Sequence, residues 1–200
     1  MNAIANPLNP QKPFPAKTLV IIGMPGSGKS SIGRKLALRL NLPFYDSDLE
    51  VEKAAGMKVE QIFAQLGEPA FRDGERRVIG RLLEQPPHVL ATGGGAFMDI
   101  ETRALIRSHG VSIWLRADFD LLLERTSRRN DRPLLKGADI GQKLKELLAA
   151  REPIYAIADL TVASDRRPPD ETAERVLKAI DDFFRQYPPS SPSAGFDPAS

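Results

Sequence analysis

The glycine-rich segment Gly23–Ser30 constrains this chain more than any other feature of its sequence. It runs Gly-Met-Pro-Gly-Ser-Gly-Lys-Ser and matches the pattern Gly-x-x-x-x-Gly-Lys-Ser/Thr. The apolar run Leu19–Ile22 precedes it and predicts a buried strand, and the apolar spacing over Ile32–Leu40 predicts a helix. A strand, a glycine loop and a helix N-terminus together cradle a triphosphate, because backbone N–H groups and the helix dipole converge on phosphate oxygens.

Side chains in this segment are suited to phosphate chemistry. We expect Lys29 to contact the β- and γ-phosphates and the Ser30 hydroxyl to bind Mg²⁺. The other expected ATP ligands of the segment are Gly26, Ser27, Gly28 and Ser31. A glycine-rich turn that only joins a strand to a helix is the alternative interpretation.

Composition indicates an ordinary globular domain. The chain has 200 residues, of which 42% are hydrophobic and 27% charged, and a net charge of +2 gives no reason to expect a nucleic-acid partner. It contains no cysteine, which excludes disulfides and is consistent with a reducing cytoplasm. No apolar run approaches the roughly 20 residues of a membrane span, and Met1–Ala16 lacks the apolar core of a secretory signal. We therefore expect a cytoplasmic protein without a membrane partner.

Proline content divides the chain into three parts. Residues 1–16 contain four prolines and predict a flexible extension, and residues 187–200 predict a disordered Pro/Ser-rich tail. The folded unit is then residues 17–186.

Strands and helices are expected to alternate within this unit. The further expected strands are Leu42–Asp46, His88–Ala91, Val111–Leu115 and Leu160–Ala163. The further expected helices are Asp48–Ala55, Val59–Leu66, Pro69–Leu83, Asp99–Ser108, Asp118–Ser127, Lys143–Ala150 and Pro169–Arg185. This alternation predicts an α/β fold with a parallel sheet covered by helices on both faces.

Polar or glycine-rich segments follow each expected strand. Ligands of such sheets bind beyond the carboxyl ends of the strands, so these segments are predicted to line one cleft. They are Gly23–Ser30, Asp46–Asp48, Thr92–Gly95, Arg116 and Ser164–Arg167.

Two of these segments suggest an acceptor site. In Asp46-Ser47-Asp48, one carboxylate near Mg²⁺ and one facing a substrate alcohol would serve phosphoryl transfer. The alternative is that Asp46, Ser47 or Asp48 only caps the helix that follows. The triplet Gly93–Gly95 suggests a second loop that a ligand approaches closely, and a plain flexible turn is the alternative.

Three arginines are candidates for binding a substrate anion. Glu75 lies one helical turn after Arg72 and can orient it, and Arg151 is a second candidate. Arg132 lies in a loop without apolar periodicity, which predicts a mobile lid that excludes water from the transferred phosphoryl group. Each of the three arginines has a solvated surface charge as its alternative.

Taken together, these motifs resemble shikimate kinase over Leu19–Phe184. In chain order they are Gly-Met-Pro-Gly-Ser-Gly-Lys-Ser, Asp-Ser-Asp, Gly-Glu-x-x-Phe-Arg-x-x-Glu, Gly-Gly-Gly-Ala, Arg-Pro-Leu-Leu and Arg-x-Pro-x-Tyr. The resemblance implies a three-layer P-loop kinase fold like that of nucleoside monophosphate kinases. Its five-stranded parallel sheet would have the order 2-3-1-4-5, with a mobile lid at about residues 126–139. It also implies a monomer that uses Mg²⁺ and ATP to phosphorylate the 3-hydroxyl of shikimate, giving shikimate 3-phosphate and ADP in the chorismate and aromatic amino-acid pathway.

The resemblance also assigns an acceptor site. Shikimate would be bound by Asp48, Arg72, Gly94, Gly95 and Arg151. Asp48 would hold ring hydroxyls and act as the base, and the two arginines would bind the carboxylate.

The donor side is assigned in the same way. Arg132 would contact the transferred phosphate and, with Lys29 and Asp48, complete the catalytic residues. Asp46 would hold Mg²⁺ through water beside Ser30. Arg125 and Arg167 would flank the adenine.

Two other functions remain open from the sequence. A gluconate or nucleoside monophosphate kinase shares the phosphate loop and the lid, but lacks the complete set of motifs above. A non-catalytic nucleotide-binding switch is less favoured, and the guanine-recognition string Asn-Lys-x-Asp does not occur in the chain.

Overall fold

The computed structural model of the chain describes residues 17–128 and 139–187. The predicted N-terminal extension and nearly all of the predicted C-terminal tail lie outside the described residues. So do residues 129–138 of the predicted lid, and Arg132 with them.

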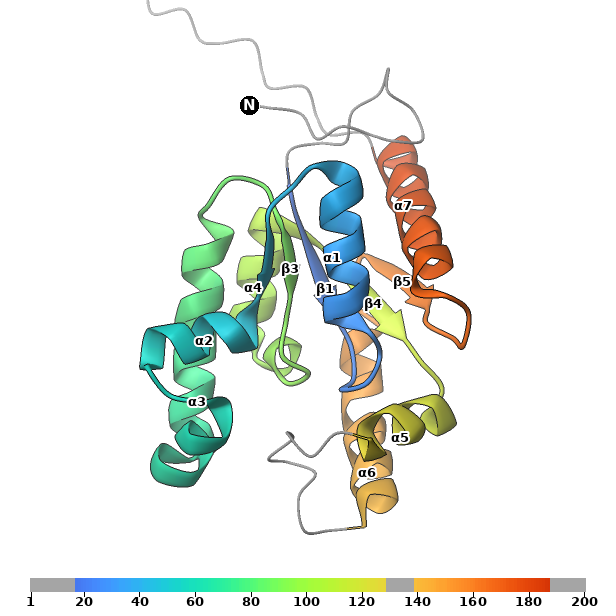
Figure 1. Cartoon of the computed structure of the whole chain (residues 1–200). Coiled ribbons are helices and arrows are strands. Elements are labelled where there is room, and N and C mark those ends of the chain that lie inside the picture. Colours follow the sequence, from blue (N-terminus) through green and yellow to red (C-terminus); the bar gives the residue numbers. More distant parts are fainter. Residues whose placement is uncertain (1–16, 129–138, 188–200) are drawn as a thin grey trace, which may run out of the picture.

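A five-stranded parallel sheet forms the centre of the domain (Figure 1). Its strands are β1 (Thr18–Ile22), β2 (Phe44–Asp46), β3 (Val89–Ala91), β4 (Gly110–Arg116) and β5 (Leu160–Ala163). The spatial order is β2-β3-β1-β4-β5, and every pairing is parallel. This confirms the order that the resemblance implied.

Seven α-helices and one short 3₁₀ helix are found among the described residues. The α-helices are α1 (Lys29–Leu40), α2 (Ser47–Ala55), α3 (Val59–Leu83), α4 (Ile100–His109), α5 (Phe119–Ser127), α6 (Ile140–Tyr155) and α7 (Pro169–Gln186). The 3₁₀ helix is η1 (Ala96–Met98).

Helices cover both faces of the sheet because successive side chains of a strand point to opposite faces. In β1, Leu19 and Ile21 pack in one core cluster with α1 and α7, whereas Val20 and Ile22 pack in another with α3, α5 and α6. Figure 1 shows α1 and α7 side by side in front of the sheet and α4 behind it. The domain therefore has three layers, as expected.

Three local details bear on the expected helices. The N-cap of α2 is Asp46, whose carboxylate accepts a hydrogen bond from the Asp48 N–H, so Ser47 and Asp48 lie inside the helix. The two helices expected between residues 59 and 83 are present as the two segments of α3, which are separated by a non-helical Gly67 with a φ of +82°. Helix α6 extends beyond the expected span and includes Arg151.

None of the helices in the described ranges combines the length and the apolarity that a membrane crossing requires.

Candidate active site

The phosphate loop connects β1 to α1 at the carboxyl edge of the sheet. Gly23, Gly26 and Gly28 have φ values of +140°, +85° and +95°, a region that favours glycine. A Cβ atom at residue 23 would also lie only 2.7 Å from the Leu115 carbonyl oxygen. These positions therefore require glycine for the backbone to curl around a phosphate.

The Lys29 side chain lies within this loop. Its Nζ donates to the carbonyl oxygens of Gly23 and Met24, both at 2.9 Å. The ammonium group is thus buried at the N-terminus of α1, where the helix dipole also favours an anion.

Ser30 and Asp46 meet beside the loop. The Ser30 hydroxyl donates to Oδ2 of Asp46 at 2.6 Å. A cluster of three or more acidic, histidine or cysteine side chains is not found in the described ranges. A hydroxyl and a carboxylate suit Mg²⁺, which takes few protein ligands and keeps several waters and phosphate oxygens. The residues present therefore fit the expected metal.

The second glycine segment packs closely against charged side chains. A Cβ atom at Gly93 would lie 2.7 Å from Oδ1 of Asp48, and one at Gly95 would lie 2.5 Å from Nη1 of Arg72. The Gly93 N–H donates to the Ser47 hydroxyl at 2.9 Å, which fixes the loop to the start of α2. Only glycine leaves room for these groups at the loop surface.

The two glycine loops touch one another. A Cβ atom at Gly94 would lie 2.9 Å from Cδ of Pro25 in the phosphate loop and 3.3 Å from Nη1 of Arg151. The phosphate loop, the second loop and a buried arginine are therefore neighbours at one edge of the sheet.

Glu75 is buried beneath Arg72. Nη1 of Arg72 donates to Oε2 of Glu75 at 2.7 Å, as their spacing of three residues predicts. Oε1 of Glu75 has no hydrogen-bond partner within the described part of the chain. Burial raises the pKa of Glu75 to about 7 and the Asp48 carboxylate adds to the rise, while the Arg72 charge opposes it.

Tyr155 supports the second loop from α6. Its hydroxyl donates to the Gly94 carbonyl oxygen, and its ring centroid lies 5.9 Å from that of Trp114. Burial raises the pKa of Tyr155 to about 12, so the hydroxyl remains a donor. Arg151, one turn earlier in α6, is only 7% exposed.

A polar network joins the phosphate loop to the loop between β5 and α7. Arg125 of α5 donates to the carbonyl oxygens of Gly26 at 3.2 Å and Asp165 at 2.9 Å. The Ser164 hydroxyl donates to the Ser27 carbonyl oxygen at 2.7 Å. These bonds hold the β5–α7 loop against the phosphate loop.

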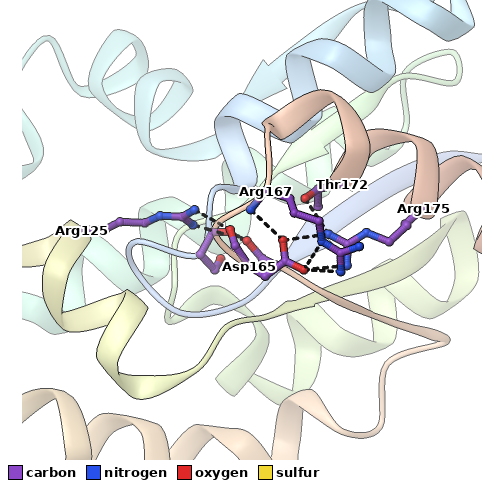
Figure 2. A network of polar contacts seen from close by, with 7 residues as sticks. Arg125, Asp165, Arg167, Thr172 and Arg175 are labelled. Atoms are coloured by element: carbon purple, nitrogen blue, oxygen red, sulfur yellow. Dashed lines mark hydrogen bonds and ion pairs between the residues drawn. The ribbon is translucent and has the colours of Figure 1, made fainter.

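The Arg167 side chain is part of this network. Its guanidinium donates to Oδ2 of Asp165 at 2.6 Å and 2.9 Å (Figure 2). A pocket of about 450 Å³ lies beside it, lined by Asp118, Asp120, Leu121, Asp165, Arg166 and Arg167.

Not every residue expected at the cleft contributes to these contacts. Arg116 pairs with Glu152 of α6 at 3.0 Å and lies over the Trp114 ring. Sequence reasoning did not predict the hydrogen bonds that join the hydroxyls of Ser47 and Tyr155 to the second glycine segment, although both residues lie inside motifs that it identified. It placed Asp165 in a segment that lines the cleft but gave its side chain no role, and the string Asp-Arg-Arg is only a weak signal for one.

Comparison with known proteins identifies a family. The family model for shikimate kinase matches residues 25–181. A shikimate kinase of Caulobacter vibrioides is 56% identical over 168 residues, which are 84% of this chain and 84% of that protein. One of Bradyrhizobium diazoefficiens is 54% identical over 165 residues, or 82% of this chain and 80% of that protein.

Solved structures agree with this result. A shikimate kinase from Acinetobacter baumannii in complex with shikimate has a TM-score of 0.81 and 34% identity, over 84% of this chain and 94% of that one. A gluconokinase from Sinorhizobium meliloti has a TM-score of 0.60 at 19% identity, over 86% and 95%, and shares the fold alone. This chain belongs to the shikimate kinase family.

Proposed function

We propose that this shikimate kinase transfers the γ-phosphoryl group of ATP to the 3-hydroxyl of shikimate, giving shikimate 3-phosphate and ADP. The contact between the two glycine loops is the observation that carries the proposal. It sets a triphosphate-binding loop beside a segment faced by Asp48, Arg72 and Arg151. A carboxylate and two guanidinium groups suit a substrate that carries both hydroxyls and a carboxylate.

The acceptor is bound by charge and hydrogen bonds. Arg72 and Arg151 bind the carboxylate of shikimate, and Gly94 and Gly95 leave room for its ring. Glu75 and Glu68 both accept hydrogen bonds from the Arg72 guanidinium, and the distance from its Nη2 to Oε1 of Glu68 is 3.0 Å. Because the side chain is already held in place, it loses less conformational entropy when shikimate binds. Asp48 accepts a hydrogen bond from the ring hydroxyl and takes its proton as the oxygen attacks the γ-phosphorus.

The donor is bound by the phosphate loop. Backbone N–H groups from Gly26 to Ser31 and the Lys29 ammonium bind the β- and γ-phosphates. The Ser30 hydroxyl and the Asp46 carboxylate would hold the Mg²⁺ that accompanies ATP, and the ion would supply charge neutralisation at these phosphates.

Two further roles complete the donor side. Arg125 and Arg167 flank the adenine, and their anchoring to the β5–α7 loop supports this role. Arg132, which lies outside the described residues, contacts the transferred phosphoryl group in this proposal. That role rests on its motif.

We also propose a monomer that acts on two small molecules in the cytoplasm. The family resemblance supports the monomer, and ATP as donor supports the compartment.

A substrate panel tests the reaction. ADP release is measured with Mg²⁺-ATP and shikimate, gluconate or a nucleoside monophosphate as acceptor. We expect turnover with shikimate and only background with the others. Preference for gluconate or a nucleotide would overturn the proposal, and so would ATP binding without turnover on any acceptor. The Lys29→Ala variant provides the background, because the phosphates lose their principal cation.

A further inference from the structure

Asp165 connects the two arginines that the proposed function assigns to adenine (Figure 2). Its backbone carbonyl oxygen accepts from Nη2 of Arg125 at 2.9 Å. Its carboxylate accepts from the backbone N–H of Arg167 at 3.1 Å, and from Nε and Nη2 of that residue at 2.9 Å and 2.6 Å. One residue of the β5–α7 loop therefore holds both guanidinium groups.

Arg175 ties this residue to helix α7. Its Nη1 lies 3.1 Å from Oδ2 of Asp165, and its Nη2 lies 3.2 Å from Oδ1. Nη2 also donates to the Thr172 hydroxyl at 3.0 Å, and Thr172 is buried. Because Ala173 and Val176 of the same helix are in the core, α7 is a rigid anchor for the loop.

The charges in this cluster persist over the working pH range. The hydrogen bond from Arg167, followed by the contacts with Arg175, holds the pKa of Asp165 at about 2. One carboxylate thus faces two guanidinium groups beside the phosphate loop. Bidentate arginine–carboxylate contacts also fix direction, which a single ammonium cannot do.

We propose that Asp165 and Arg175 are positioning residues for ATP, which hold Arg125 and Arg167 in the arrangement that receives the nucleotide without contacting it themselves. This inference rests on the proposed function, because it takes from it the role of the two arginines. A free arginine side chain loses rotamer freedom when a ligand fixes it, so an arginine that is already fixed binds more tightly. The pair should therefore affect nucleotide affinity and leave the acceptor site unchanged.

Two substitutions test the pair. In Asp165→Asn and Arg175→Met, we expect the KM for ATP and the Kd for ADP, measured by calorimetry, to rise about threefold to tenfold. The kcat and the KM for shikimate should stay the same. The double variant should bind ADP no more weakly than the single variant with the lower affinity, because both changes remove the same interaction between Asp165 and Arg175. Arg175→Lys should give an intermediate value, since a lysine makes only one of the two contacts.

Arg39→Met is the matched control. Arg39 of α1 forms ion pairs with Asp170 and Glu174 of α7, the helix that carries Arg175. Its side chain is 26% exposed, against 28% for that of Arg175. Within the described part of the chain, its ion pairs are with these two α7 residues and not with Asp165, so we expect unchanged nucleotide affinity. Thermal unfolding of each variant checks folding, and Asp165→Asn carries the test if Arg175→Met does not fold.

The outcomes separate this inference from the proposed function. Arg125→Met tests the nucleotide site directly. If it weakens ADP binding while Asp165→Asn and Arg175→Met do not, the positioning role is wrong and the proposed function stands. A lower kcat with an unchanged KM for ATP in those two variants would also overturn the positioning role. If Arg125→Met leaves ADP binding unchanged, the proposed nucleotide site fails together with the inference.

Discussion

Gly95 lies against the guanidinium group of Arg72, so closely that a Cβ atom at residue 95 would be 2.5 Å from Nη1. The same constraint recurs at Gly93, where a Cβ atom would be 2.7 Å from Oδ1 of Asp48. Real Cβ atoms do not approach other atoms this closely, so the charged side chains of the acceptor site occupy the space that larger residues would need. The second glycine loop is shaped by these charges rather than by a need for flexibility.

Gly95→Ala should therefore weaken shikimate binding. The added methyl group displaces the Arg72 guanidinium, and a misplacement of a binding group by about 1 Å can lower the reaction rate by a factor on the order of 100. We expect the KM for shikimate to rise about 10- to 100-fold, with the KM for ATP unchanged, in steady-state kinetics. Gly80→Ala is the control, since a Cβ atom there would lie 3.6 Å from Leu105, an ordinary contact. An unchanged KM for shikimate in Gly95→Ala would contradict the geometry.

Much of the fold could be predicted because its signals are local. The phosphate loop, five strands and the aspartates after β2 all depend on residues that are neighbours in sequence. The cap of α2 could be placed only within Asp46, Ser47 and Asp48, because all three are good capping residues, and the structure has Asp46 as the cap. The interruption of α3 at Gly67 was predicted, because the expected helices end at Leu66 and begin again at Pro69.

Contacts that join distant segments could not be predicted from spacing. The bond from Ser164 to the Ser27 carbonyl spans 137 residues, and the bond from Arg125 to Gly26 spans 99. The first bond exists because β5 and β1 lie in one sheet, and the second because α5 follows β4, which pairs with β1. The strand order followed from the family resemblance rather than from the pattern. The Asp165 carboxylate pairs with Arg167 and Arg175, two and ten residues further along the chain, and its residue type alone gave no warning of these contacts.

Glu75 should make stability depend on pH. Its pKa rises from 4.5 to about 7 in the folded protein. Its contribution to the free energy of unfolding is therefore fully present below pH 4.5 and is lost as the pH rises through 7. Glu75→Gln does not ionise. Relative to this variant, the wild-type free energy of unfolding should fall on the order of 3 kcal/mol between pH 4.5 and 8. Denaturant unfolding at several pH values measures the difference, and parallel curves for the two proteins would contradict it.

Asp46→Asn should raise the requirement for Mg²⁺. Asparagine retains the N-cap of α2 but removes the charge beside Ser30, and loss of such a supporting group costs about 10- to 100-fold in metal affinity. We expect a corresponding rise in the Mg²⁺ concentration for half-maximal rate at fixed ATP. Asp99→Asn is the matched control, because Asp99 caps α4 through the Thr102 N–H at 2.7 Å. Equal Mg²⁺ dependence of both variants would exclude Asp46 from the metal site.

Tyr155→Phe should loosen the acceptor site without affecting ATP. The variant removes the donor to the Gly94 carbonyl oxygen, and a buried acceptor without its partner costs about 1–3 kcal/mol. We expect a lower free energy of unfolding and a KM for shikimate that rises several-fold, because Gly94 no longer holds its position beside Arg151. Tyr45→Phe is the control, since the Tyr45 ring of β2 packs edge-on against His88, which lies directly before β3 and not in the second glycine segment. If both variants change the KM for shikimate equally, Tyr155 has no specific role in the loop.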